Sequence, residues 1–298
     1  MRQALIKALM TYKDRPDFCV IAGDLGYGVL EPLQEVLGDR FINAGISEQN
    51  MISLAAGLAQ SGIRPFVYSI SPFIYARALE QIRNDLCLQD LPVCLIASGA
   101  GYGYGNQGPS HHALEDYGII STLQNIKIFI PSFREDMKDI AAMMIETEHP
   151  VYLRLGRDES SVKSVRPSFS AYRKLKSGAS GVILVIGNMA GSMIDFCPEN
   201  FALWSCGVLP AADIPRELLE DIRDSGALAV IEDHVSAGSL AGQFCACMLE
   251  AGIRPGKFMR FYAQGYVNDL YGSQDYYRKH NGLNLNAIKA KLEEVISE

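Results

Sequence analysis

Glu48 is the side chain whose position in this sequence points most directly to chemistry. It follows Ser47 and opens a largely apolar run from Met51 to Ala59. A helix that is apolar on nearly all sides is buried in a core or an interface. An ionised carboxylate there is costly unless a charged or strongly hydrogen-bonding group meets it. The alternative interpretation is a cap, because Ser47 and Glu48 both suit a helix N-terminus and its dipole.

A glycine-rich segment ends in two histidines and forms a second candidate site. It reads GAGYGYGNQGPSHH, from Gly99 to His112, and directly follows an apolar run. In open parallel sheets the carboxyl ends of strands hold ligand crevices, and glycines let the backbone approach a ligand. His111 beside such a loop could transfer a proton or bind a polar substrate. For the glycines alone, a flexible surface loop is the alternative.

Two aromatic and two basic residues also lie where apolar runs end. Phe73 and Tyr75 start a helical pattern, and either belongs to the core unless a flat ligand binds above the sheet. Arg154 and Arg157 lie at the end of a later run. One of these arginines could form a salt bridge while the other faces an anionic substrate.

The elements that must position these residues alternate between strand and helix along the whole chain. Short apolar runs predict buried strands at 18–22, 65–69, 93–97, 127–130 and 151–155. Helical patterns fall between them at 51–61, 74–90, 113–123 and 133–147. Strands separated by helices of this length indicate parallel pairing with helices on both faces. The predicted class is therefore α/β.

A polar stretch rich in Ser, Lys and Arg follows Arg157 and predicts a linker that ends one domain. We expect two three-layer αβα domains, at 1–170 and 171–298. The second should contain strands at 181–186, 201–207, 227–232 and 258–262, with helices near 193 and at 216–225 and 239–251.

Composition narrows the class of protein further. The chain has 298 residues, 48% of them hydrophobic and 20% charged, which suits a folded protein of two domains. A net charge of -7 argues against nucleic acid or an anionic membrane as the main partner. No apolar run approaches the roughly 18 residues of a membrane span. The seven cysteines lie mostly in apolar segments, which indicates reduced thiols and a cytoplasmic location, and none has the spacing of a metal site.

Several motifs together resemble the C-terminal part of a transketolase, in the split form in which two subunits share what is elsewhere one polypeptide. The motifs occur in family order as FINAGISEQNMISLAAGLA, SPFIYARALEQIRND, GNQGPSHHALEDYGII, IFIPS and PVYLRLGR, followed by VIEDHVSAGSLAG in the second domain. The resemblance covers roughly residues 15 to 265. It implies a pyrimidine-type fold for binding thiamine diphosphate, followed by a C-terminal domain of the transketolase type.

The resemblance also implies roles for single residues in the transfer of a two-carbon ketol unit from a ketose to an aldose. Glu48 matches the glutamate that hydrogen-bonds the aminopyrimidine of the cofactor, and its neighbour Ser47 is grouped with the cofactor contacts. Phe73 matches the aromatic residue that stacks on the pyrimidine, with Tyr75 as the alternative. His111 matches a histidine that faces the substrate near the reactive carbon.

The substrate contacts in this resemblance include both matches and departures. Arg157 matches an arginine that holds the sugar phosphate, with Arg154 as the alternative. Gln107 stands where the family has an acidic contact for a substrate hydroxyl. Ser98 and Gly99 stand where the family has a histidine that contacts substrate phosphate. We therefore expect a sugar or sugar phosphate outside the standard phosphorylated pentose set.

The charged end of the cofactor has no matching motif in this chain. Family members hold the diphosphate through Mg²⁺ with GDG and a later Asn. Here Gly23-Asp24-Leu25 with Asn50 imitates that spacing, but the third position is Leu and Asn50 already belongs to the SEQN motif. We expect no metal ligand here and an N-terminal partner subunit that holds Mg²⁺. The expected assembly is an α₂β₂ heterotetramer that shares the cofactor and buries the helix at 51–58.

Three other functions remain as alternatives. A β subunit of a 2-oxoacid dehydrogenase shares the split architecture and the glutamate, and a deoxyxylulose-phosphate-synthase-like enzyme would likewise act on pyruvate. A non-catalytic scaffold is the third, although it would have no need of Glu48, Phe73 and His111 together. A Rossmann dehydrogenase is excluded, because no GxGxxG joins a first strand to a helix.

Overall fold

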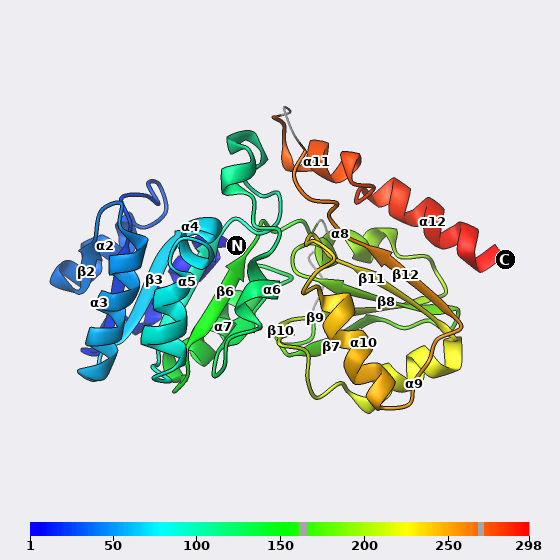
Figure 1. The fold of residues 1–298 in the computed structure, drawn as a ribbon, viewed down its shortest axis with the longest axis horizontal. Coiled ribbons are helices and arrows are strands. Elements are labelled where there is room, and N and C mark those ends of the chain that lie inside the picture. The colour runs from blue at the N-terminus through cyan, green and yellow to red at the C-terminus, as the bar shows by residue number, and fades with distance from the viewer. Residues whose placement is uncertain (161–165, 268–270, 298) are drawn as a thin grey trace.

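The computed structural model describes residues 1–160, 166–267 and 271–297 of the chain. The chain forms two sheets, each covered by helices on both faces, and the two halves lie side by side (Figure 1). The predicted α/β class with two three-layer αβα domains is confirmed.

Seven strands form the first sheet, in the spatial order β10-β5-β6-β4-β3-β1-β2. Their bounds are β1 Phe18–Ala22, β2 Phe41–Asn43, β3 Arg64–Ile70, β4 Cys94–Ser98, β5 Lys127–Phe129, β6 Val151–Leu155 and β10 Val208–Leu209. All neighbouring strands run parallel except β10, which comes from the second half of the chain and pairs antiparallel with β5. The five strands expected from apolar runs are present. The short strands β2 and β10 carry too few residues to show a pattern.

Helices cover both faces of this sheet. One face carries α1 (Arg2–Leu9), α2 (Glu31–Leu37) and α7 (Asp136–Glu146). The other carries α3 (Glu48–Gln60), α4 (Ser71–Tyr75), α5 (Leu79–Gln81), the π-helix η3 (Ile82–Cys87) and α6 (Asp116–Ile120).

The single helix expected at 74–90 is broken into α4, α5 and η3. Ile74, Ala78, Ile82 and Leu86 are nevertheless all buried, so the four-residue spacing that predicted one helix does mark one buried face. A π-turn adds a residue per turn without disturbing this spacing greatly, and such turns occur often at functional sites.

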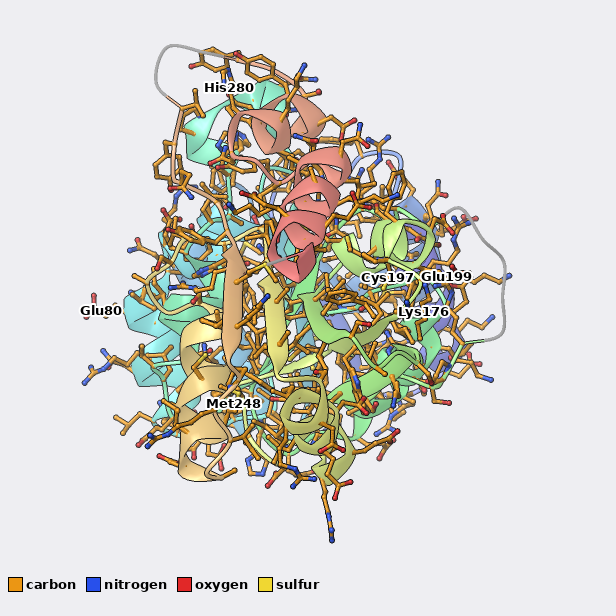
Figure 2. The ribbon with its side chains drawn as sticks, turned by 90° about the vertical axis from the view of Figure 1, so that its right-hand side faces the viewer. Glu80, Lys176, Cys197, Glu199, Met248 and His280 are labelled. Carbon is orange, nitrogen blue, oxygen red and sulfur yellow. The ribbon has the colours of Figure 1, made fainter. Side chains whose placement is uncertain are left out.

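The second sheet has five strands in the order β12-β11-β8-β9-β7. Their bounds are β7 Tyr172–Lys176, β8 Gly181–Ile186, β9 Phe201–Cys206, β11 Ala227–Ile231 and β12 Lys257–Phe261. Helices α9 (Arg216–Ser225) and α10 (Leu240–Glu250) cover one face, and α8 (Met189–Phe196) and α12 (Leu285–Ser297) cover the other. Met248 on α10 and Cys197 after α8 accordingly lie on opposite sides of the strands (Figure 2).

Part of the expected linker is in fact a strand. Residues 172–176 form β7, which pairs antiparallel with β9 at the edge of the second sheet. The polar sequence YRKLK suits an edge strand, where charged side chains protect the open edge. Residues 161–165 of the same stretch lie outside the described residues. Helix α11 (Gln274–His280) and helix α12 were not expected.

Buried polar bonds fix the second half of the chain to the first. Arg154 on β6 pairs with Asp116 and Asp233, with N–O distances of 2.8 Å to each, and all three side chains are at most 1% exposed. The Tyr117 hydroxyl donates to Glu232 over 2.5 Å, and the Gly118 amide donates to His234 Nε2 over 3.2 Å. The motif EDH at the end of β11 therefore serves as a bridge between the halves, and His234 has the structural hydrogen bond expected of it.

The boundary near residue 170 stays a proposal. It separates the strands of the two sheets except for β10, which returns to the first sheet. No helix in the described ranges is long and apolar enough to cross a membrane.

Candidate functional site

The candidate residues gather at the carboxyl edge of the first sheet. Strands β2, β1, β3, β4 and β6 are neighbours in that order, and all run parallel. The segments that leave their carboxyl ends carry Glu48, Phe73, the glycine-rich loop and Arg157. Parallel pairing thus brings together side chains that are more than 100 positions apart.

Glu48 is the first residue of α3, and its side chain is only 3% exposed. Ser69 Oγ on β3 donates to Glu48 Oε1 over 3.1 Å, and Arg77 Nη1 donates to Oε2 over 2.6 Å. Ser47 does not cap α3, because its hydroxyl donates to the Ala44 carbonyl instead. The two oxygens of Glu48 therefore bond side chains outside their own helix, which argues against the capping interpretation.

Arg77 was missed in the sequence analysis. It lies between α4 and α5 with its side chain 45% exposed, and its Cζ is 4.5 Å from the centroid of the Phe73 ring. The signal that could have found it is the requirement that a buried carboxylate meets a cation. Within YARALEQIR, however, Arg77 and Arg83 are equally good candidates for that cation.

Phe73 also contacts His111. The two rings meet edge to face, with centroids 5.1 Å apart and an interplanar angle of 66°. His111 ends the short helix η5 (Pro109–His111), and its Nδ1 lies 3.0 Å from Ser110 Oγ. Burial lowers the pKa of His111, so the ring stays neutral near pH 7. Glu48, Arg77, Phe73 and His111 therefore form one contiguous series of contacts.

Three other candidates are not part of this series. Tyr75 is 3% exposed, and its hydroxyl donates to Glu115 Oε2 over 3.0 Å, so it has no free face for a ligand. Arg154 is buried among carboxylates as described above, which argues against a role in holding substrate. Gln107 is exposed on the short helix η4 (Gly105–Gln107).

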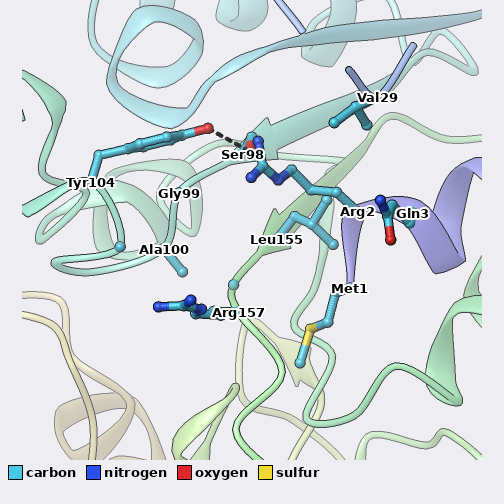
Figure 3. Close-up of a pocket in the computed structure, with 12 residues that line it drawn as sticks. Met1, Arg2, Gln3, Val29, Ser98, Gly99, Ala100, Tyr104, Leu155 and Arg157 are labelled. Carbon is cyan, nitrogen blue, oxygen red and sulfur yellow. Dashed lines mark hydrogen bonds between the residues drawn. The ribbon is translucent and has the colours of Figure 1, made fainter. Parts of the chain in front are cut away.

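A cavity of about 360 Å³ opens beside the series (Figure 3). Arg157 after β6 and Arg2 at the start of α1 both line it, together with Ser98 at the end of β4 and Tyr104. No Asp or Glu lies among the lining residues that the structure describes. Two guanidinium groups without a lining carboxylate make this cavity suited to an anion. Arg2 was missed, because no pattern in the sequence connects α1 with the end of β6.

Tyr104 connects the cavity to the contact series. Its hydroxyl lies 3.1 Å from Ser98 Oγ, and its ring centroid is 6.3 Å from that of His111. The loop that carries Tyr104 is held tightly, since a Cβ at Gly105 would come within 2.6 Å of the Gly272 carbonyl oxygen. The segment before α11 therefore closes over the glycine-rich loop.

The pyrimidine end of a thiamine cofactor fits this site, since a buried carboxylate and an aromatic face already hold a flat, hydrogen-bonding group. The charged end has no counterpart. Within the described ranges, no three His, Cys, Asp or Glu side chains gather so that they could hold a metal ion. Asp24 instead accepts hydrogen bonds from Tyr27 and Asn43.

Comparison with known proteins agrees with this geometry. Residues 1–162 match the family model described as "Transketolase, pyrimidine binding domain". The chain is 26% identical to one subunit of the apulose-4-phosphate transketolase of Actinobacillus succinogenes, over 90% of this chain and 89% of that subunit. It is 32% identical to 1-deoxy-D-xylulose-5-phosphate synthase of Chlorobium phaeovibrioides, over 97% of this chain but only 46% of that protein.

Among solved structures, a split-gene transketolase described as an inactive beta4 tetramer superposes with a TM-score of 0.82 at 28% identity. The match covers 99% of this chain and 97% of that one. The fold is thus a pyrimidine-type thiamine-diphosphate-binding domain followed by a C-terminal domain of the transketolase type. The chain belongs to the transketolase family, as its motifs predict.

Proposed function

We propose that this chain is the pyrimidine-side subunit of a split, thiamine-diphosphate-dependent transketolase. The observation that carries the proposal is the carboxylate of Glu48, which is buried at the carboxyl edge of the sheet, next to the stacking face of Phe73. The similarity to a subunit of a two-subunit-type transketolase, along nearly the whole length of both chains, supports it.

Thiamine diphosphate, when bound, supplies the nucleophilic carbon that attacks the carbonyl group of a ketose. The residues of this chain do the rest. Glu48 holds a proton between its carboxylate and the pyrimidine ring nitrogen, and Ser69 fixes the other carboxylate oxygen. Phe73 orients the ring by stacking. His111, neutral near pH 7, moves protons at the substrate oxygens.

The cavity between Arg2 and Arg157 takes the anionic end of the substrate in this proposal. Two guanidinium groups bind a phosphate through charge-assisted hydrogen bonds, and Arg2 compensates for the family histidine that Ser98 and Gly99 replace. A phosphorylated sugar is therefore favoured. Its carbon skeleton differs from that of the standard pentoses, because Gln107 stands at a position that is acidic in the family.

A partner subunit completes the site in this proposal. It binds Mg²⁺ and the diphosphate, for which the described part of this chain has no ligands. Tyr27 and Ile46, which are 78% and 84% exposed, flank the carboxyl edge and suit an interface. The inactivity of the beta4 tetramer of the split-gene relative also supports a requirement for a second subunit. An α₂β₂ heterotetramer in the cytoplasm is the proposed form.

Helix α3 contributes less apolar surface to that interface than its sequence indicated. Met51, Ile52, Ala55, Ala56 and Ala59 are buried within this chain. Only its outer edge remains for a partner.

The second candidate is a synthase-like reaction on pyruvate, which the match to 1-deoxy-D-xylulose-5-phosphate synthase favours. Reconstitution with a diphosphate-binding subunit separates the two. The proposal expects turnover of a ketose phosphate with an aldose acceptor and none of pyruvate. Turnover of pyruvate alone supports the synthase or the 2-oxoacid dehydrogenase alternative, and cofactor-free assembly without turnover supports the scaffold.

A further inference from the structure

Arg77 makes both contacts that an aminopyrimidine ring requires in this site. Its Nη1 donates to Glu48 Oε2 over 2.6 Å, and its Cζ lies 4.5 Å from the centroid of the Phe73 ring. A guanidinium is planar and delocalised, so it can stack on an aromatic face while it donates to a carboxylate. An aminopyrimidine is likewise flat and bonds a carboxylate through its edge.

We propose that Arg77 stands in for the pyrimidine ring and leaves Glu48 and Phe73 when the cofactor binds. This inference rests on the proposed function. The two groups exclude one another, because each needs the same oxygen of Glu48 and the same aromatic surface. Arg77 is then a positioning residue that keeps the empty site assembled.

The burial of Glu48 explains why a stand-in is needed. The carboxylate is 3% exposed, and Ser69 and Arg77 are the side chains of the described residues that bond it. Ser69 is neutral and satisfies only one oxygen. A buried carboxylate left without a counter-charge destabilises the fold. Arg77 supplies that charge until a ligand replaces it.

The position of Arg77 explains how it can leave. Its side chain is 45% exposed, and it lies in the break between α4 and α5, next to the π-helix η3. Arg154 shows the opposite design, since it is fully buried and held by two carboxylates. One guanidinium is a permanent part of the core, and the other sits at the surface on a single ion pair.

The inference predicts a competition that can be measured. If only a fraction of the protein has Arg77 displaced, the apparent affinity for the cofactor falls by that fraction. Removal of Arg77 should therefore tighten binding of thiamine diphosphate. It should not alter binding of pyrophosphate, which lacks the ring.

The test uses the complex of this chain with its diphosphate-binding subunit, in wild-type, Arg77→Leu and Arg83→Leu forms. Isothermal titration measures the binding of magnesium thiamine diphosphate and of magnesium pyrophosphate. We expect Arg77→Leu to bind thiamine diphosphate about tenfold more tightly, as for a form one-tenth populated. Its pyrophosphate affinity, and both affinities of the Arg83→Leu control, should stay unchanged. Unaltered or weaker thiamine diphosphate binding, or equal tightening of pyrophosphate, overturns the inference.

A second measurement uses the full chain alone and requires no cofactor. Arg77→Leu should lower the melting temperature in the wild-type background but far less in the Glu48→Gln background, where no buried charge remains. Equal lowering in both backgrounds contradicts the stand-in role. If Arg77→Leu does not fold, Arg77→Lys keeps the charge without the flat face. It should tighten thiamine diphosphate binding by a smaller factor, and no tightening counts against the proposal.

These outcomes separate the two proposals. A wild-type complex that binds no thiamine diphosphate overturns the proposed function. Binding that is indifferent to Arg77 overturns only the stand-in.

Discussion

Phe73 and His111 meet edge to face with ring centroids 5.1 Å apart, although 38 positions separate them in the chain. Phe73 follows β3 and His111 ends the glycine-rich loop that follows β4, so the contact depends on the parallel pairing of these two strands. It joins the cofactor end of the site to the substrate end. Each half of this pair has a separate and measurable role.

Loss of the Phe73 ring should weaken binding of the cofactor. Phe73→Ala removes the stacking face, which we expect to cost about 1 kcal/mol beyond the lost apolar contact. The dissociation constant for thiamine diphosphate in the reconstituted complex should rise roughly tenfold. Tyr75→Phe is the matched control, since Tyr75 is buried away from the ring, and it should leave that constant unchanged. Equal weakening in both variants would show that stacking is not the cause.

Loss of the His111 ring should slow turnover without loss of the cofactor. His111→Asn removes a proton-transfer group, and such groups contribute about 10²- to 10⁴-fold to rate. The steady-state rate should fall within that range while thiamine diphosphate titrations match the wild type. A fall in cofactor affinity without a fall in rate would assign His111 to the wrong end of the site.

The pH dependence of His111 follows from its burial. Burial disfavours the charged imidazolium, so the pKa lies below the usual 6.5 and the ring is neutral above that pH. The rate should therefore hold steady from about pH 7 to 8 and decline only below about pH 6.5. Titration of the imidazole proton resonance, assigned by its absence from His111→Asn, measures the pKa directly. A pKa above 6.5 would contradict the account.

Arg2 and Arg157 should distinguish phosphorylated from unphosphorylated sugars. Arg157→Leu or Arg2→Leu removes a charge-assisted bond worth about 1.5 to 3 kcal/mol, so KM for a sugar phosphate should rise about 10- to 100-fold. KM for the matching unphosphorylated sugar should change little. Arg83→Leu controls for the loss of a surface charge. An identical rise for both sugars would place the anion elsewhere.

Arg154 should act on stability instead. Replacement of Arg154 by Leu leaves Asp116 and Asp233 buried without their cation, which typically costs about 3 to 5 kcal/mol. Urea unfolding should show a correspondingly lower free energy of unfolding. Arg216→Leu, at a surface pair with Glu220, should change it by less than about 1 kcal/mol.

The strands were predictable because burial on both faces leaves a simple signal. The runs at 18–22 and 151–155 match β1 and β6 to the residue. Strand β7 was hidden because an edge strand carries the charged side chains that also mark a linker. The helix at 74–90 was drawn too long because its buried positions keep a four-residue spacing through the breaks.

The site was predictable only where single residues carry a strong constraint. Glu48 stood out because a carboxylate at the head of an apolar helix demands a partner. The identity of that partner depends on how β3 and α5 are placed, so Arg77 could not be chosen over Arg83. Arg2 joins Arg157 only through the packing of α1 on the sheet, and no local pattern records that packing. Arg154 resembled a substrate contact because charge is visible in a sequence, whereas a buried ion pair with Asp233 is not.

The central claim is that the Glu48 carboxylate activates the cofactor, and one measurement tests it most directly. The complex reconstituted with Glu48→Gln is compared with wild type for turnover of a ketose phosphate, with assembly followed by size-exclusion chromatography. The account predicts intact assembly and a loss of turnover of at least about 100-fold, as expected for a proton-transfer group. Intact assembly with wild-type turnover would contradict it.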